Sequence, residues 1–239
     1  MERIFTNREL AEILAILLSV AAAAANNLRR MIKALLLIFD PIATWERIFQ
    51  ARRSLVFILL AYLLPMALLS TLCEAYGLVH WGKVRGELGG DPKPFSLNET
   101  VVIELAQFLL SVGVIFIGAK LVKALGETFH GRHTFTQAFA TVAYGLSPLF
   151  LLRALDALPS VNPYVSWAIG ILLSMGVLYQ GVPRMMVPDP PHAFGLYVMS
   201  ALLLALISGL VRFVTAMYLI GKFSKLQVIV NDLAAHLPF

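Results

Sequence analysis

Cysteine is almost absent from this sequence, and the short motifs that mark common enzymes are missing. Cys73 is the only cysteine among 239 residues, so an intrachain disulfide and a cysteine-based metal site are both excluded. The sequence contains no GxxxxGK[ST] phosphate loop, no HExxH zinc motif and no GxSxG nucleophile motif. The usual residue sets for nucleotide hydrolysis, metalloproteolysis and serine acyl transfer are therefore lacking. We predict a protein that is not an enzyme and that holds no cofactor and no metal ion.

Charge is scarce as well. Only 14% of the residues are charged while 59% are hydrophobic, and the mean hydropathy is +0.80. This balance is far from that of ordinary soluble domains. The net charge of +5 comes from Lys and Arg residues that lie beside apolar segments rather than in a solvated basic domain. The pattern favours contact with anionic lipid headgroups of a bilayer and argues against nucleic-acid binding.

Long apolar runs dominate the sequence instead. Five runs of about 19 to 27 residues are bounded by charged residues, Pro or Gly, and a membrane-spanning helix needs about 20. They are Ser54 to Ala75, Val101 to Val122, Thr136 to Leu155, Tyr164 to Val182 and Ala193 to Leu219. The predicted fold class is all-α, a polytopic membrane helix bundle of five spans with amino-terminal interfacial helices. The predicted domains are an amino-terminal interfacial segment (1–53), a five-span membrane domain (54–222) and a short carboxyl-terminal tail (223–239).

The amino-terminal segment is harder to interpret. Residues 9–25 contain a shorter apolar stretch that ends in five alanines. This stretch could span the membrane, lie on it, or be an extension ahead of a start at Met31, and we favour a helix that does not cross. Residues 28–39 carry cations spaced for one face of an interfacial helix, which Asp40-Pro41 should end. Residues 44–53 are aromatic and cationic, and we expect them to rest on the cytoplasmic headgroups.

The distribution of Lys and Arg predicts the orientation. Most of these residues lie before the first span and in the loops after the second and fourth spans. By the positive-inside rule, the amino terminus is cytoplasmic and the carboxyl terminus is outside.

Two features predict how the spans are held together. Helix association in lipid depends on small residues at four-residue spacing. Such stripes are Ser166, Gly170 and Ser174 in the fourth span, Ala201, Ala205 and Gly209 in the fifth, and a weaker one at Ala67, Thr71 and Ala75 in the first. The loop at residues 182–195 has four prolines and should be a rigid turn rather than a helix. We expect its Met185-Met186 pair to dip into the interface and to fasten the fourth span to the fifth. Pro65 and Pro148 should each kink a span.

Five charged residues are predicted to lie at one depth near the outer ends of the spans, at 1.5 Å per helical residue. They are Glu74, Glu104, Arg153, Asp156 and Arg212. Arg153 and Asp156 have the three-residue spacing of a helix surface pair. We predict a polar layer in which Arg212 turns inward and pairs with Glu104, locking the second and fifth spans together. In the alternative, Arg212 snorkels to the outer headgroups and Glu104 is hydrated at the surface.

Histidines provide the nearest arrangement to a metal site. His130 and His133 lie close together in the sequence, and His192 lies on the next cytoplasmic loop. Gly131 between His130 and His133, and the lack of a Cys, Asp or Glu ligand beside that pair, disfavour metal binding, and we interpret the nearby Glu127 as a solvated loop residue. We interpret the histidines themselves as interfacial.

Scattered aromatic, glycine and proline positions resemble those of a known family. They are Asp40-Pro41 to Trp45, Phe129-x-Gly131-x-His133-Thr134-Phe135-x-Gln137-Ala138, Tyr144-x-x-x-Pro148 and Tyr179-x-Gly181-x-Pro183. With these motifs the chain resembles a bacterial member of the Yip (Ypt-interacting protein) domain family over about Met31 to Lys222. The resemblance implies a five-helix integral membrane domain with a cytoplasmic amino terminus, here in the bacterial inner (cytoplasmic) membrane. Eukaryotic members are associated with Rab-type GTPases and vesicle traffic, and this chain lacks their long polar amino-terminal region.

Two functions from different classes fit the sequence. The first is a membrane-organising or protein-interaction scaffold, which contacts a membrane-protein partner or a second copy through its helices and headgroups through a cationic cytoplasmic face. The second is a small-solute or ion transporter or channel, favoured by the kinked spans and by Glu104 and Arg212 within apolar segments. The odd number of spans argues against transport because it gives no simple inverted repeat.

Overall fold

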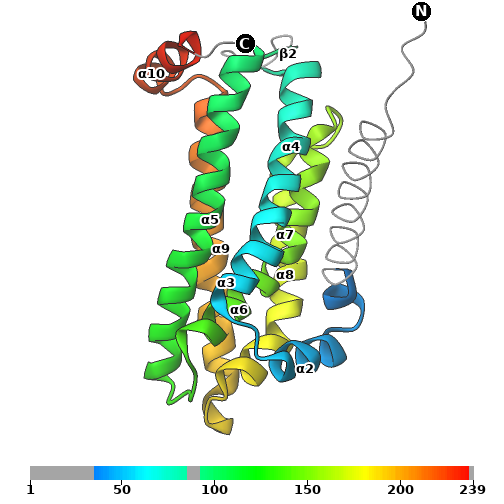
Figure 1. The fold of residues 1–239 in the computed structure, drawn as a ribbon, viewed down its shortest axis with the longest axis vertical. Helices are drawn as coiled ribbons and strands as arrows, with labels where there is room; N and C mark the ends of the chain where they lie inside the picture. Colours follow the sequence, from blue (N-terminus) through cyan, green and yellow to red (C-terminus); the bar gives the residue numbers. More distant parts are fainter. Residues whose placement is uncertain (1–34, 85–91, 237–239) are drawn as a thin grey trace, which may run out of the picture.

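The five predicted spans form one helical bundle in the computed structural model, which describes residues 35–84 and 92–236 (Figure 1). The helical segments that are long and apolar enough to cross a membrane are Leu55–His80, Leu97–Thr128, Phe135–Ala157, Pro163–Met186 and Pro190–Leu219. The predicted all-α membrane bundle of five spans is therefore confirmed. The prediction for residues 9–25 lies outside the described residues, as does most of that for 28–39.

The two ends of the bundle carry different short elements. Helix α2 (Pro41–Ala51) lies across one end, where α5 connects to α6 and α8 to α9. The opposite end carries the short antiparallel pair β1 (Lys83–Val84) and β2 (Pro92–Lys93), together with helix α10 (Ser224–Ala235). We call these the α2 end and the α10 end. The segment predicted as a short tail thus contains a helix that returns to the bundle, since the Asn98 side chain of α5 donates to the Ala234 carbonyl at 3.1 Å.

The first span is interrupted just before its proline. It consists of α3 (Leu55–Ile58), the π-helical turn η1 (Leu59–Leu63) and α4 (Leu64–His80). The Leu64 N–H bonds to the Leu59 carbonyl, one residue further back than in an α-helix. Pro65, which has no N–H to donate, follows directly within the continuous helix Leu55–His80.

The third span is interrupted at its proline too. It consists of α6 (Phe135–Gly145), α7 (Ser147–Arg153) and the 3-10 turn η2 (Ala154–Ala157). The helix breaks at Leu146 (φ −88°, ψ 9°), and Pro148 stands in the first turn of the helix that follows. The π-helical turn before Pro65 and the break before Pro148 lie where the sequence predicts kinks, and the bending of the two spans stays a prediction. The second span, α5 (Leu97–Thr128), is unbroken and about 48 Å long at 1.5 Å per residue.

The fourth span is longer than the sequence predicts. Helix α8 (Pro163–Met186) continues through Pro183, so residues 182–186 are helical and their predicted rigid turn is wrong. The helix ends at Val187, which adopts a left-handed conformation (φ 43°). Met186 is fully buried, and a Cβ atom at Gly126 of α5 would lie 2.7 Å from its Cε. Met186 thus contacts the second span. The short turn η3 (Pro190–His192) leads into the fifth span, α9 (Ala193–Leu219).

The bundle has an apolar core and an apolar outer surface. Fully buried Trp45, Phe139, Leu178 and Met186 join α2, α6 and α8. Large side chains such as Leu105, Leu172 and Leu206 are more than half exposed on the outside of the spans, as expected where helices face lipid.

Candidate functional site

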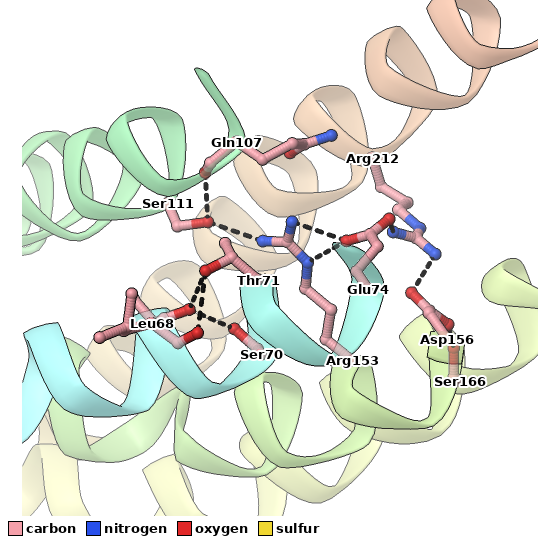
Figure 2. A network of polar contacts seen from close by, with 11 residues as sticks. Leu68, Ser70, Thr71, Glu74, Gln107, Ser111, Arg153, Asp156, Ser166 and Arg212 are labelled. Carbon is pink, nitrogen blue, oxygen red and sulfur yellow. Dashed lines mark hydrogen bonds and ion pairs between the residues drawn. The ribbon is translucent and has the colours of Figure 1, made fainter. Parts of the chain in front are cut away.

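Buried charges from several spans meet in one network (Figure 2). The network lies toward the α10 end of the bundle. The Glu74 carboxylate of α4 is 1% exposed, accepts a hydrogen bond from Arg153 Nε of α7 at 2.9 Å, and forms an ion pair with Arg153 Nη2 at 2.8 Å. The other oxygen of Glu74 lies 3.7 Å from Nη1 of Arg212, on α9. Glu74 is therefore held between two guanidinium groups that are themselves nearly buried.

Asp156 and Ser111 extend this cluster. Asp156 in η2 forms an ion pair with Arg212 and accepts a hydrogen bond from Ser166 Oγ of α8 at 2.6 Å. The Ser111 hydroxyl of α5 accepts from Arg153 Nη1 at 2.7 Å and donates to the Gln107 carbonyl at 2.7 Å. Each of the five spans thus contributes a residue to one connected polar network.

The pairing within the network differs from the prediction. Arg212 forms its ion pairs with Asp156 and Glu74, so the predicted pair with Glu104 is wrong. Glu104 is buried on α5 and interacts electrostatically with Arg153. Arg153 and Asp156 lie three residues apart, yet each forms its ion pair with a residue of another span. Neighbouring helices, rather than surface pairs within one helix, therefore connect these charges.

A cavity of about 70 Å³ borders the network. Arg153, Asp156, Ser166 and Arg212 line it on one side, and apolar groups such as Phe150 line it as well. A cavity of this size has room for a few water molecules beside the charges.

The predicted small-residue stripes of the fourth and fifth spans lie at contacts between helices. A Cβ atom at Gly170 would lie 3.0 Å from the Leu149 Cα, so α8 approaches α7 closely there. On α9, a Cβ atom at Gly209 would lie 3.0 Å from the Trp167 ring of α8. The other members of the two stripes are Ser166, Ser174 and Ala201, which are buried, and Ala205, which is half-buried.

Helix α2 is anchored in the bundle by one tryptophan. Trp45 is fully buried, and its Nε1 donates to the Val177 carbonyl of α8 at 2.9 Å. The ring lies against Gly181, where a Cβ atom would be 2.4 Å from two ring atoms. It also makes an edge contact with Tyr144, at 6.4 Å between ring centroids. The sequence predicts that this segment rests on headgroups, but Trp45 inserts into the protein.

The other positions of the family-like motif lie in the α5–α6 connection, in the third span and in the last turns of α8. A Cβ atom at Gly131 would lie 2.9 Å from the Met186 carbonyl oxygen, so this loop closely approaches the end of α8. Tyr179 packs edge-on against Tyr197 of α9, at 5.2 Å between centroids. Pro148 begins α7 and Pro183 lies in the last turns of α8. The motif marks close backbone approaches and helix starts rather than a set of reactive groups.

A second pocket opens between α2 and the start of α6. Its volume is about 310 Å³, and its lining combines polar groups with an apolar floor. The lining includes Arg52, Arg53, Thr136, Gln137, Ala140 and Met185. Both arginines are exposed. Helix α6 begins here with a capping box in which Thr134 and Gln137 bond each other's backbone N–H groups.

Sequence reasoning missed three contributions to these sites. Ser111 is one of many serines in apolar helices, and nothing in the sequence marks it as an arginine partner. Trp45 and Gly181 are far apart in the chain, although a glycine within a span is a signal of close approach. The sequence shows that Arg52 and Arg53 are cationic. It does not show the pocket beside them, because the start of α6 forms the other side of that pocket.

Comparison with known proteins identifies one family. The family model described as the Yip1 domain matches residues 35–223. Searches of the curated proteins and of the solved structures give no significant match to this chain.

Proposed function

Because the chain belongs to the Yip1 domain family, we propose that it is a non-enzymatic membrane-organising scaffold that binds anionic lipid headgroups at the α2 end. In this proposal the α2 end is cytoplasmic, and the protein resides in the inner membrane of a bacterium. The observation that carries the proposal is the pocket of about 310 Å³ beside Arg52 and Arg53.

The pocket has the chemistry that a phospholipid headgroup requires. Two guanidinium groups can pair with phosphate oxygens, and Arg does so through two parallel hydrogen bonds. The amino terminus of α6 adds a positive dipole end at the same place. Ile58, Ala140 and Met185 supply an apolar floor on which acyl or glycerol carbons could pack.

The lipid preference is our first prediction. The purified full chain, incubated with equal amounts of phosphatidylglycerol and phosphatidylcholine, is expected to retain the anionic lipid in native mass spectrometry. The double variant Arg52→Gln/Arg53→Gln should lose this preference. Each cation near an anionic surface contributes about 1 kcal/mol, so two correspond to roughly a 30-fold change in relative retention.

Arg47→Gln provides a matched control for that experiment. Arg47 lies on the same helix with its side chain 65% exposed, near Asp40 and outside the pocket lining. This variant should keep the wild-type preference. Equal retention by wild type and the double variant would contradict headgroup binding in the pocket.

The polar network supports the scaffold role. It joins all five spans through ion pairs and hydrogen bonds, which favours a fixed arrangement of the helices. Their exposed leucines then present an apolar surface of constant shape to lipid, to a membrane-protein partner or to a second copy. Mass measurement of the protein in lipid nanodiscs would distinguish a monomer from a homo-oligomer.

The orientation gives a second prediction. In a Cys73→Ser background, Ser160→Cys places an exposed thiol in the α7–α8 connection, and Thr128→Cys places one at the opposite end of the bundle. A membrane-impermeant maleimide should label residue 160 in intact bacterial spheroplasts, and residue 128 only after the membrane is permeabilised. The reverse pattern would overturn the orientation.

A small-solute or ion transporter is the second candidate function. The cavity of about 70 Å³ beside Arg153, Asp156 and Arg212 favours it, because buried charges next to a cavity are typical of transport sites. Towards the α2 end the core instead contains large apolar side chains, Phe139 and Leu178 among them. Solute or ion flux into proteoliposomes above the protein-free level, abolished by Arg212→Ala, would favour transport over the scaffold.

A further inference from the structure

Two connections at the α2 end bring three metal-ligand side chains together. His130 lies in the α5–α6 connection, and Asp189 and His192 lie in the α8–α9 connection. One ligand atom of each residue lies within 4.8 Å of the others. The ring centroids of His130 and His192 lie 5.7 Å apart, with the ring planes tilted by 37°.

The two connections are fixed against each other by contacts outside this cluster. The Arg132 N–H donates to the Val187 carbonyl at 3.3 Å. The Phe129 ring lies against Gly195, where a Cβ atom would be 3.0 Å from the ring. A bound ion would thus meet side chains whose backbones already have their relative positions, which lowers the entropic cost of assembling the site.

Local backbone geometry sets the direction of each ligand. His130 adopts a left-handed conformation (φ 56°), which few residues other than glycine adopt and for which histidine is comparatively enriched. Asp189 and His192 are the two ends of one turn, closed by a 2.9 Å hydrogen bond from the His192 N–H to the Asp189 carbonyl. Pro190 and Pro191 between them restrict the backbone of that turn.

The three clustered residues differ from the three histidines that the sequence indicates, because Asp189 takes the place of His133. His133 bonds to the Lys123 carbonyl at 3.2 Å and fills the space beside Gly126, and it does not belong to the group formed by the three ligands. Asp189 supplies a carboxylate ligand, which the sequence does not place beside the pair His130 and His133. Asp189 and His192 lie in the connection that follows the fourth span, and only the fold brings them close to His130.

We propose that His130, Asp189 and His192 bind a divalent transition-metal ion, with Zn²⁺ the best fit. Two imidazole nitrogens and one carboxylate oxygen are three of the donors that Zn²⁺ prefers, and the exposure of all three residues leaves a fourth position for water. Ions that require oxygen ligands, such as Mg²⁺ and Ca²⁺, do not match two imidazoles. The bound ion would join the two connections and stabilise the α2 end.

The test uses the full chain, purified in detergent with a tag that contains no histidine and freed of metal with EDTA. Titration with ZnCl₂ in a calorimeter should show one saturable site, and titration with MgCl₂ should show none. His130→Ala, His192→Ala and Asp189→Asn should each weaken Zn²⁺ binding at least about tenfold, since even the loss of a residue that only supports a ligand costs 10- to 100-fold.

His236→Ala is the matched control, because His236 is exposed and lies at the α10 end, after α10. It should bind Zn²⁺ as the wild type does. Melting curves in EDTA establish that each variant is folded, and excess ZnCl₂ should raise the melting temperature of the wild type but not that of His192→Ala. The proposal is overturned if the wild type shows no saturable Zn²⁺ binding, or if His192→Ala and Asp189→Asn bind Zn²⁺ as tightly as the wild type.

Discussion

Replacing Glu74 with alanine is expected to lower the free energy of unfolding by about 3–5 kcal/mol. The carboxylate is 1% exposed and lies between the guanidinium groups of Arg153 and Arg212, whose side chains are 14% and 12% exposed. Its removal would leave the nearly buried Arg153 without the carboxylate that forms its ion pair. An unpaired buried charge is costly, whereas an exposed ion pair contributes about 0–1 kcal/mol.

Glu127→Ala is the appropriate comparison, because it removes a carboxylate of the same helical bundle from an exposed pair. Glu127 pairs with Lys123, and their side chains are 58% and 33% exposed. Unfolding in mixed detergent micelles of rising dodecyl sulfate content would report both free energies. If the two variants unfold at the same dodecyl sulfate content, the charges around Glu74 are hydrated and the polar network does not hold the spans together.

The sequence predicts the spans of this fold better than the pairing of their charges. Length and hydrophobicity are properties of single segments, so the five spans could be found without knowledge of their neighbours. Counting residues from the end of a span also gives the depth of each residue in the membrane. The residues predicted at one depth include Glu74, Arg153, Asp156 and Arg212, which do meet in one network. The rotation of each helix about its axis decides which charges meet. Helices that are apolar on all sides carry little periodicity to indicate it.

The pairing of Arg212 illustrates this limit. Its predicted partner, Glu104, lies on α5, but Asp156 in η2 and Glu74 on α4 take that place. The 3-10 turn that carries Asp156 follows a helix break at Leu146. Neither the break nor the rotation of α7 after it can be derived from residue counting along a straight span. The position of Asp189 beside His130 depends in the same way on the fold, because the two residues lie in different connections.

The second large effect is expected at Gly181, where α8 meets the tryptophan of α2. A Cβ atom at this position would lie 2.4 Å from Cε2 and Cζ2 of Trp45, far inside van der Waals contact. The ring cannot move aside freely because it is fully buried and its Nε1 bonds to the Val177 carbonyl. Gly181→Ala should therefore destabilise the protein by about 1–3 kcal/mol, the usual cost of overpacking a core.

Gly176→Ala is a control on the same helix. A Cβ atom at Gly176 meets nothing within 4 Å, so this variant should be neutral or slightly more stable, since alanine is favoured over glycine by up to about 1 kcal/mol in a helix. If Gly181→Ala loses stability and Gly176→Ala does not, the effect is assigned to the contact with Trp45. Equal behaviour of the two variants would show that α2 does not pack on α8 as described.

A double-mutant cycle isolates the contact between the two residues. Trp45→Ala alone should cost about 3–5 kcal/mol, as expected for removal of a large buried aromatic side chain. In the variant that carries both changes, the added methyl group of residue 181 enters space that the ring has left. The double variant should therefore be no less stable than Trp45→Ala alone, and the sum of the single losses should exceed its loss by about 1–3 kcal/mol. Additive losses would mean that residue 181 and the Trp45 ring do not touch, and the anchoring of α2 through Gly181 would have to be abandoned.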